Sequence, residues 1–179
     1  SYPFTFAKIR DDKSHFSAMI KTMDDTTNEL VVSDTKHILD YLDNNEDLNH
    51  NGYGAIGYCM SGQYIVSVAS TYPKKIVAAA SFYGVKILTD KNNSPHLQAN
   101  KIEADLYLAF AEKDTWVDSD ALKNIKNHFE KNTPNFRMEV YEGTEHGFAF
   151  PDRHTYNKNG AEKHWSRICN LFERSLKNK

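Results

Sequence analysis

The chain has 179 residues, of which 40% are hydrophobic and 12% aromatic, and its 22 basic and 24 acidic residues leave a net charge of −2. This composition predicts a single globular domain over residues 1–179 with no basic surface for nucleic acid. The apolar runs are far shorter than the roughly 18 residues that cross a bilayer, and the amino terminus has no recognisable signal region. Two cysteines do not make a disulfide framework in a chain this long, so we expect free thiols and a cytoplasmic protein.

The first part of the chain predicts one helix and little else. Residues 1–26 are weakly patterned, and Asp11 to Lys13 is typical of a turn or loop. From Thr27 to Asn44 apolar residues recur at helical spacing, which predicts an amphipathic helix. The residues that define this apolar stripe are Leu30, Val31, Ile38, Tyr41 and Leu42.

Beyond residue 53 strands and helices alternate. We expect strands over 54–58, 76–83, 106–111 and 136–141, helices over 61–72 and 119–131, a loop over 142–154 and a last helix from near Thr155. Trp165, Ile168, Phe172 and Leu176 would share one face of that last helix, and Cys169 would fall on its apolar side. This alternation predicts an α/β fold, a three-layer sandwich around a mostly parallel sheet.

The stretch Gly54 to Gly62 is the most informative one. An apolar run ends in Gly-x-Cys-x-x-Gly and passes directly into a helical pattern, which predicts a strand, a tight turn with Cys59 at its apex, and a helix from Ser61. In such a turn the N–H of Met60 faces whatever the thiol attacks, and the helix start favours a thiolate and a developing oxyanion. The alternative is an ordinary strand-to-helix junction with a buried, inert cysteine.

Two further loops follow strands at the same edge of the sheet. Asp114 comes after the strand that ends near Ala111, and His146 comes after the strand that ends near Tyr141. A nucleophile, an acid and a histidine in this order are typical of α/β-hydrolases. His146 would exchange the proton of Cys59, and Asp114 would orient His146.

Each of these residues has a plainer alternative. Asp114 or Asp118 could cap the following helix, which is a common role for an aspartate in such a loop. Asp114 is preferred over Asp118 as the acid because it lies closer to the strand end. His146, between Glu145 and Gly147, could be a solvated turn residue.

From about Thr27 to its end, the chain resembles the dienelactone hydrolase family of α/β-hydrolases. The motifs that carry the resemblance are Gly57-Tyr58-Cys59-Met60-Ser61-Gly62, Ser94-Pro95-His96, Ala109 to Asp114, Tyr141 to Phe148 and His164-Trp165. The resemblance implies hydrolysis of small-molecule esters or lactones, without a cofactor, through an acyl-cysteine. It implies Cys59 as nucleophile, Asp114 as orienting acid, His146 as base and the Met60 N–H as an oxyanion donor.

The chain departs from this family in two ways. Better-known members have a serine directly after the histidine and an arginine four residues after it, where this chain has Gly147 and Phe150. No strand pattern precedes the strand that leads to Cys59. We therefore expect only four strands, with that strand at an open edge, and either self-association into a homo-oligomer or weak activity.

Other residues have less specific roles. Tyr83, Trp116 and Phe148 are expected as walls of a substrate pocket. His96 could reach the site or make a structural loop contact, and His164 is expected to pack or hydrogen-bond within the core. His146, His154 and His164 match no compact metal-ligand spacing, so no metal site is expected.

Two other classes of function stay open from the residues alone. One is a non-catalytic binding or assembly protein that keeps the fold. The other is a redox-reactive protein that uses the thiol of Cys59 but hydrolyses no ester.

Overall fold

The computed structural model describes residues 13–45, 48 and 51–177, and its centre is a parallel sheet of four strands in the order β1-β2-β3-β4. The strands are β1 (Tyr53–Tyr58), β2 (Ile76–Phe82), β3 (Asp105–Lys113) and β4 (Phe136–Glu145). The helices are α2 (Lys13–Asp25), α3 (Asn28–Asp43), α4 (Ser61–Thr71), the 3-10 helix η1 (Pro95–Lys101), α5 (Ser119–Asn132) and α6 (Lys158–Leu176). The predicted α/β architecture is confirmed.

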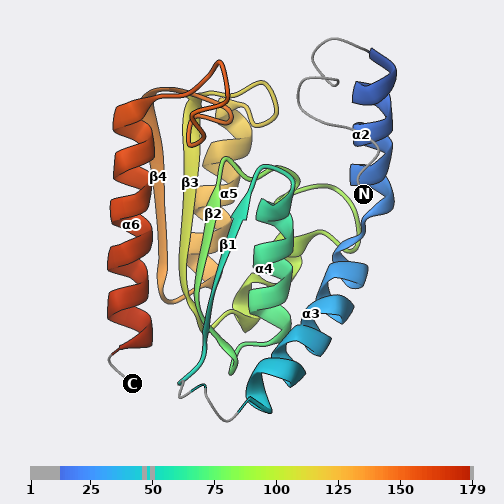
Figure 1. Ribbon diagram of the computed structural model, residues 1–179, viewed down its shortest axis with the longest axis vertical. Coiled ribbons are helices and arrows are strands. Elements are labelled where there is room, and N and C mark those ends of the chain that lie inside the picture. The colour runs from blue at the N-terminus through green and yellow to red at the C-terminus, as the bar shows by residue number, and fades with distance from the viewer. Residues whose placement is uncertain (1–12, 46–47, 49–50, 178–179) are drawn as a thin grey trace.

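Helices cover both faces of the sheet, as Figure 1 shows, with α6 on one face and α4 and α5 on the other. Successive side chains of a strand point to opposite faces of the sheet, so β2 and β3 contribute residues to two separate hydrophobic cores. The core beneath α4 and α5 contains Ala79, Leu106, Leu108, Phe110 and Phe129. The core beneath α6 contains Ala80, Phe82, Tyr107, Tyr141 and Ile168. All seven residues of β2 are buried, as expected for a strand covered on both faces.

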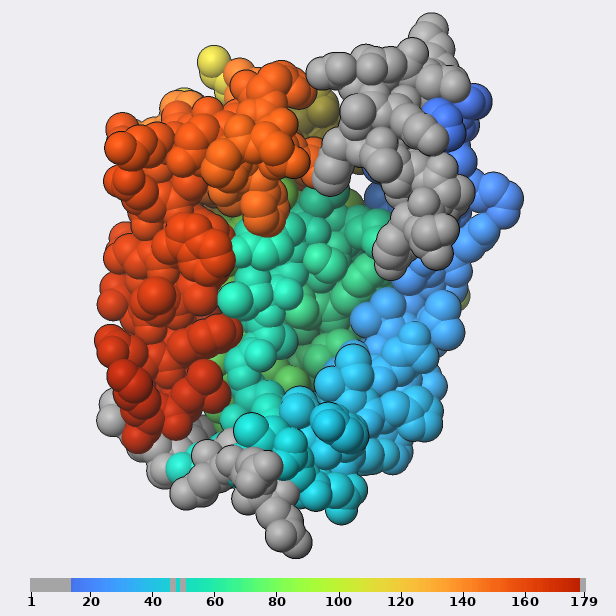
Figure 2. All heavy atoms as spheres, in the orientation of Figure 1, coloured from blue at the N-terminus to red at the C-terminus, as the bar shows by residue number. Residues whose placement is uncertain are grey.

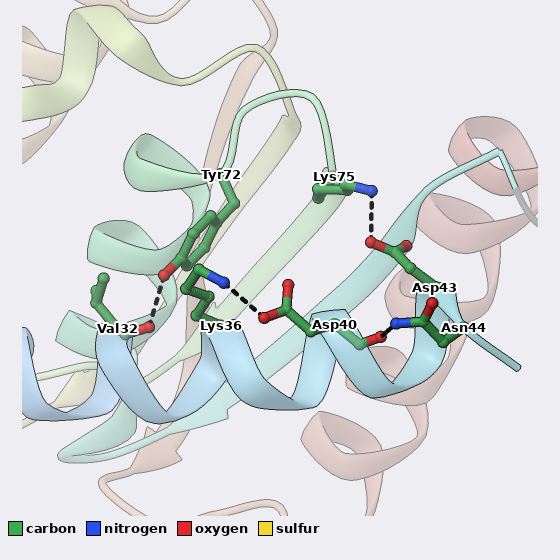
Figure 3. Close-up of polar contacts among 7 residues, drawn as sticks. All are labelled: Val32, Lys36, Asp40, Asp43, Asn44, Tyr72 and Lys75. Atoms are coloured by element: carbon green, nitrogen blue, oxygen red, sulfur yellow. Dashed lines mark hydrogen bonds and ion pairs between the residues drawn. The ribbon is translucent and has the colours of Figure 1, made fainter.

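Helix α3 packs against α4, and two residues of the segment that follows α4, Tyr72 and Lys75, make polar contacts with it (Figure 3). The Tyr72 hydroxyl, just beyond α4, donates to the carbonyl of Val32 over 2.8 Å. Lys75 forms an ion pair with Asp43 at the other end of the helix. The side chain of Thr27 caps α3 by accepting from the N–H of Leu30.

The predicted apolar stripe of α3 is only partly correct. Leu30, Ile38 and Tyr41 are 51%, 58% and 71% exposed, whereas the buried residue of this helix is Leu39. The core-facing row runs through Val31, Val32 and Leu39, because the main neighbour of α3 is α4.

The ends of the chain show further differences from the sequence-based expectations. Helix α2 was not predicted: it begins at Lys13, which was expected to lie in a turn or loop, while Asp11 and Asp12 lie outside the described residues. Strand β4 extends to Glu145, into the stretch expected to be a loop. On α6 the buried row runs through Ala161, His164, Ile168 and Leu171, whereas Trp165 is 55% exposed and Cys169 is exposed, so both were placed on the wrong face.

Strand β1 pairs with β2 alone among the described residues, which agrees with the expected edge position. In Figure 2 the atoms of β1 and α4 are visible in a recess between α6 and α3. Self-association through this edge stays a prediction. None of the described helices combines the length and the apolar character needed to cross a membrane.

Candidate active site

Cys59 stands at the apex of the turn between β1 and α4, with a backbone φ of 52°. This left-handed conformation is uncommon for a residue with a side chain, so the surrounding structure must hold it. The N–H of Cys59 donates to the Phe82 carbonyl over 3.1 Å, and the Cys59 carbonyl accepts from Gly62 and Val85. The side chain of Ser61 braces the turn by bonding both the N–H and the carbonyl of Tyr58. The predicted strained turn is therefore present.

Two glycines permit this turn to pack. A Cβ on Gly57 would lie 2.5 Å from both Ile65 Cγ1 and the Ser61 carbonyl oxygen. A Cβ on Gly62 would collide with the Cα of Gly84. The Gly-x-Cys-x-x-Gly pattern thus reflects the close approach of the start of α4 to β1 and to the end of β2.

Asp114 and His146 follow β3 and β4, and pairing of these two strands continues to Lys113 and Glu145. The N–H of His146 donates to the carbonyl of Lys113 over 3.2 Å, which holds the two loops together. Nδ1 of His146 and Oδ2 of Asp114 are 2.8 Å apart, while Oδ1 of Asp114 accepts from the N–H of Trp116. The Asp114 side chain is only 1% exposed. These contacts fix the histidine tautomer with its proton on Nδ1 whenever the ring is neutral.

The environment of His146 favours its charged form. Burial lowers the pKa of His146, but the hydrogen bond that the ring donates to Asp114 and the interaction with Cys59 outweigh burial and raise the pKa to about 9. Nε2 of His146 is buried and has no hydrogen-bond partner in the described part of the chain. Cys59 contributes to the raised pKa of His146 although no hydrogen bond joins them in the described part of the chain, so Nε2 is available to the thiol or to a ligand.

Met60 follows Cys59 as the N-cap residue of α4, which begins at Ser61, and its backbone angles are helical. The first N–H groups of a helix have no intrahelical acceptor, and they carry the positive end of the helix dipole. The backbone here can therefore stabilise negative charge that develops next to the Cys59 sulfur.

The three expected pocket walls have different positions. The Tyr83 ring lies 5.0 Å from that of His146, and its hydroxyl is buried with no hydrogen-bond partner among the residues that the structure describes. Trp116 is 50% exposed, with its ring 6.5 Å from that of His146. Phe148 is 0% exposed and packs on Tyr83 and Tyr141. It is therefore a core residue beneath Tyr83 and cannot contact a substrate directly.

Two alternatives from the sequence are resolved by the hydrogen bonds. The Asp118 side chain caps α5 by accepting from the N–H of Ala121 over 2.8 Å, so the capping role belongs to Asp118 and not to Asp114. His96 bonds the side chain of Ser94 and packs on His128, which is the structural loop contact. Within the described ranges no three His, Cys, Asp or Glu residues are grouped as metal ligands would be.

Sequence reasoning did not identify a contact directly behind the turn. The Tyr58 hydroxyl, one residue before Cys59, bonds Nε2 of His164 on α6 over 2.7 Å. His164 is fully buried, as expected for a core histidine. A tyrosine before the cysteine and a histidine in a distant helix carry no local signal that they meet.

Comparison with known proteins agrees with this geometry. The profile of the Dienelactone hydrolase family matches residues 5–176. A Synechocystis protein named "Putative carboxymethylenebutenolidase" is 29% identical over 160 residues, which cover 88% of this chain and 64% of that protein. An Aquifex aeolicus protein of the same name is 29% identical over 69% of this chain and 52% of its own length.

A solved structure shares the fold. A dienelactone hydrolase-like promiscuous phosphotriesterase from metagenomic libraries superposes with a TM-score of 0.72 at 19% identity, over 92% of this chain and 69% of that one. The chain thus spans between half and two thirds of the two named relatives, while the family profile matches it almost from end to end. The chain belongs to the dienelactone hydrolase family.

Proposed function

We propose that this chain hydrolyses carboxylic esters or lactones with Cys59 as nucleophile, His146 as the proton carrier and Asp114 as the residue that orients His146. The observation that carries the proposal is the 2.8 Å contact between His146 and Asp114 beside a strained cysteine turn. The relatives named as carboxymethylenebutenolidases support a lactone or ester as the substrate class.

In the first half-reaction the Cys59 thiolate attacks the ester carbonyl carbon, and the carbonyl oxygen becomes an oxyanion. The N–H of Met60 donates a hydrogen bond to this oxyanion. Collapse of the intermediate breaks the bond to the alkoxy oxygen, which takes the proton from Nε2 of His146. The products are an alcohol, or the opened ring of a lactone, and an acyl-thioester on Cys59.

In the second half-reaction His146 is neutral and removes a proton from water, whose oxygen attacks the thioester carbonyl. The carbon–sulfur bond then breaks, and the carboxylic acid leaves with the hydroxyl group that came from water. Sulfur departs as the Cys59 thiolate, and the proton taken from water stays on His146 as its charged partner. Asp114 stays ionised throughout, because its role is to fix the ring and to stabilise the imidazolium.

Hydrolysis of p-nitrophenyl acetate tests this proposal. We expect turnover in the wild type and in Cys169→Ser, because Cys169 is exposed on α6, and none above background in Cys59→Ala. Equal activity in the wild type and in folded Cys59→Ala would contradict the proposal.

A further inference from the structure

A partly buried hydrogen bond joins helix α6 to the residue that precedes Cys59. The Tyr58 hydroxyl and Nε2 of His164 are 2.7 Å apart, and His164 is 0% exposed. Burial raises the pKa of Tyr58 to about 12, so its hydroxyl keeps its proton.

The direction of this hydrogen bond follows from the other ring nitrogen. Nδ1 of His164 lies 2.9 Å from the carbonyl oxygen of Ala161, which can only accept, so Nδ1 carries a proton. Burial also lowers the pKa of His164, which keeps the ring neutral. Nε2 therefore has a lone pair, and the Tyr58 hydroxyl donates to it.

The Tyr58 side chain contacts three elements around the site: strand β2, the segment after His146, and helix α6. It stacks on Phe82 at the end of β2 with ring centroids 5.6 Å apart, and it meets Phe150 edge to face at 5.0 Å. Phe150 belongs to the segment that follows His146. One side chain thus contacts the neighbouring strand, the loop of the proposed base and, through His164, helix α6.

This position matters because β1 is an edge strand. Its backbone ladder runs to β2 alone among the described residues, so the end of β1 is held on one side only. Cys59, the next residue, has a strained backbone that needs support from its surroundings. The hydrogen bond from the Tyr58 hydroxyl to His164 attaches this end of β1 to α6 as well, one residue before Cys59.

We propose that Tyr58 and His164 are positioning residues. Their mutual hydrogen bond holds the thiol of Cys59 in the correct position relative to the ring of His146. Its expected effect on turnover rests on the proposed function, whereas its effect on the position of the Cys59 thiol does not. Neither residue exchanges a proton with substrate, since the Tyr58 hydroxyl is already committed to His164.

The test compares Tyr58→Phe, which removes only the hydroxyl, with the matched variant Tyr107→Phe. The Tyr107 hydroxyl is also buried and bonds that of Tyr141 over 3.0 Å, in the same core but away from Cys59. Iodoacetamide alkylation is followed on the peptide that contains Cys59, which separates it from Cys169. We expect alkylation of Cys59 to slow about tenfold in Tyr58→Phe, since small displacements of reacting groups cost up to about a hundredfold, and to be unchanged in Tyr107→Phe.

Two variants of His164 provide a second test. His164→Gln keeps an acceptor for the Tyr58 hydroxyl and should restore most of the alkylation rate that His164→Leu loses. With an active ester, the loss in Tyr58→Phe should appear in kcat with little change in KM, since no substrate contact is removed.

The outcomes separate this inference from the proposed function. Equal alkylation of Cys59 in Tyr58→Phe, Tyr107→Phe and the wild type would overturn the positioning role, even if ester turnover is present. Absence of wild-type turnover together with slow alkylation in Tyr58→Phe would reject the proposed hydrolysis and retain the positioning role.

Discussion

Asp114 and His146 are 32 residues apart in sequence, yet Oδ2 of one and Nδ1 of the other lie 2.8 Å apart. The contact arises because β3 and β4 are neighbouring parallel strands whose pairing persists to the residues just before both side chains. Because Nδ1 faces Asp114, Nε2 is on the other side of the ring, where it is buried and has no hydrogen-bond partner among the described residues.

Replacement of Asp114 by Asn tests the orienting role. The amide can still accept a hydrogen bond, but it has no charge to stabilise the imidazolium, so we expect the pKa of His146 to fall below about 9. We expect kcat to fall about 10⁴-fold, as in a serine protease triad with this Asp-to-Asn change. The two effects are measured by NMR titration of His146 and by p-nitrophenyl acetate kinetics.

The matched control is Asp118→Asn. Asp118 caps α5, and asparagine caps helices about as well as aspartate, so both activity and stability should be retained. If Asp118→Asn lost activity and Asp114→Asn did not, the roles assigned to the two aspartates would be reversed.

His146 should make stability depend on pH in a defined window. Its folded-state pKa of about 9 is above the ordinary value of 6.5, so the folded chain binds this proton more tightly than the unfolded chain. This contribution is fully present below pH 6.5 and is lost as the pH rises through about 9. Urea unfolding of the wild type and His146→Gln should give stabilities that converge as the pH rises through this window. A difference that grows with pH would contradict the assignment.

The turn before α4 should not tolerate a methyl group at Gly57. The added Cβ would lie 2.5 Å from backbone and side-chain atoms of α4, so we expect Gly57→Ala to cost about 1–3 kcal/mol of stability. Gly143→Ala is the comparison, because a Cβ there meets nothing within 4 Å and only the φ of +69° opposes it. Chemical denaturation should show the larger loss in Gly57→Ala, and the reverse order would show that the turn can open.

The Tyr83 hydroxyl has no hydrogen-bond partner among the described residues, so its removal is expected not to reduce stability. A buried polar group without a partner costs about 1–3 kcal/mol, so its removal in Tyr83→Phe should leave stability unchanged or increased. In Tyr141→Phe the hydroxyl of Tyr107 loses its partner, and we expect destabilisation. Thermal unfolding of the two variants measures this contrast. Destabilisation of Tyr83→Phe would mean that the hydroxyl has a favourable interaction in the folded protein.

Local sequence patterns were sufficient for the strands, their parallel arrangement and the strained turn at Cys59. The glycine spacing predicts the turn, and the continuous apolar runs predict the buried strands, because both are local patterns. The parallel arrangement follows from general rules for strands that alternate with helices. The helix faces were less predictable. Trp165 and Ile38 match an apolar period, but which side of a helix is buried depends on what packs there.

Contacts between distant side chains were the main omission. The bond between Tyr58 and His164 joins residues 106 positions apart, and the burial of Phe148 depends on how the segment after His146 folds back over the sheet. No spacing rule connects such residues, because their proximity is a result of the tertiary fold.

Detection of an acyl adduct is the most direct test of the proposed chemistry. The chain is mixed with p-nitrophenyl acetate, quenched in acid during turnover and analysed by peptide mass spectrometry, with His146→Ala and Cys169→Ser beside the wild type. We predict acetylation of Cys59 in the wild type and in Cys169→Ser, and its loss or strong reduction in His146→Ala. Ester turnover without any adduct on Cys59, or acetylation of Cys59 that is equally fast without His146, would contradict nucleophilic catalysis by this pair.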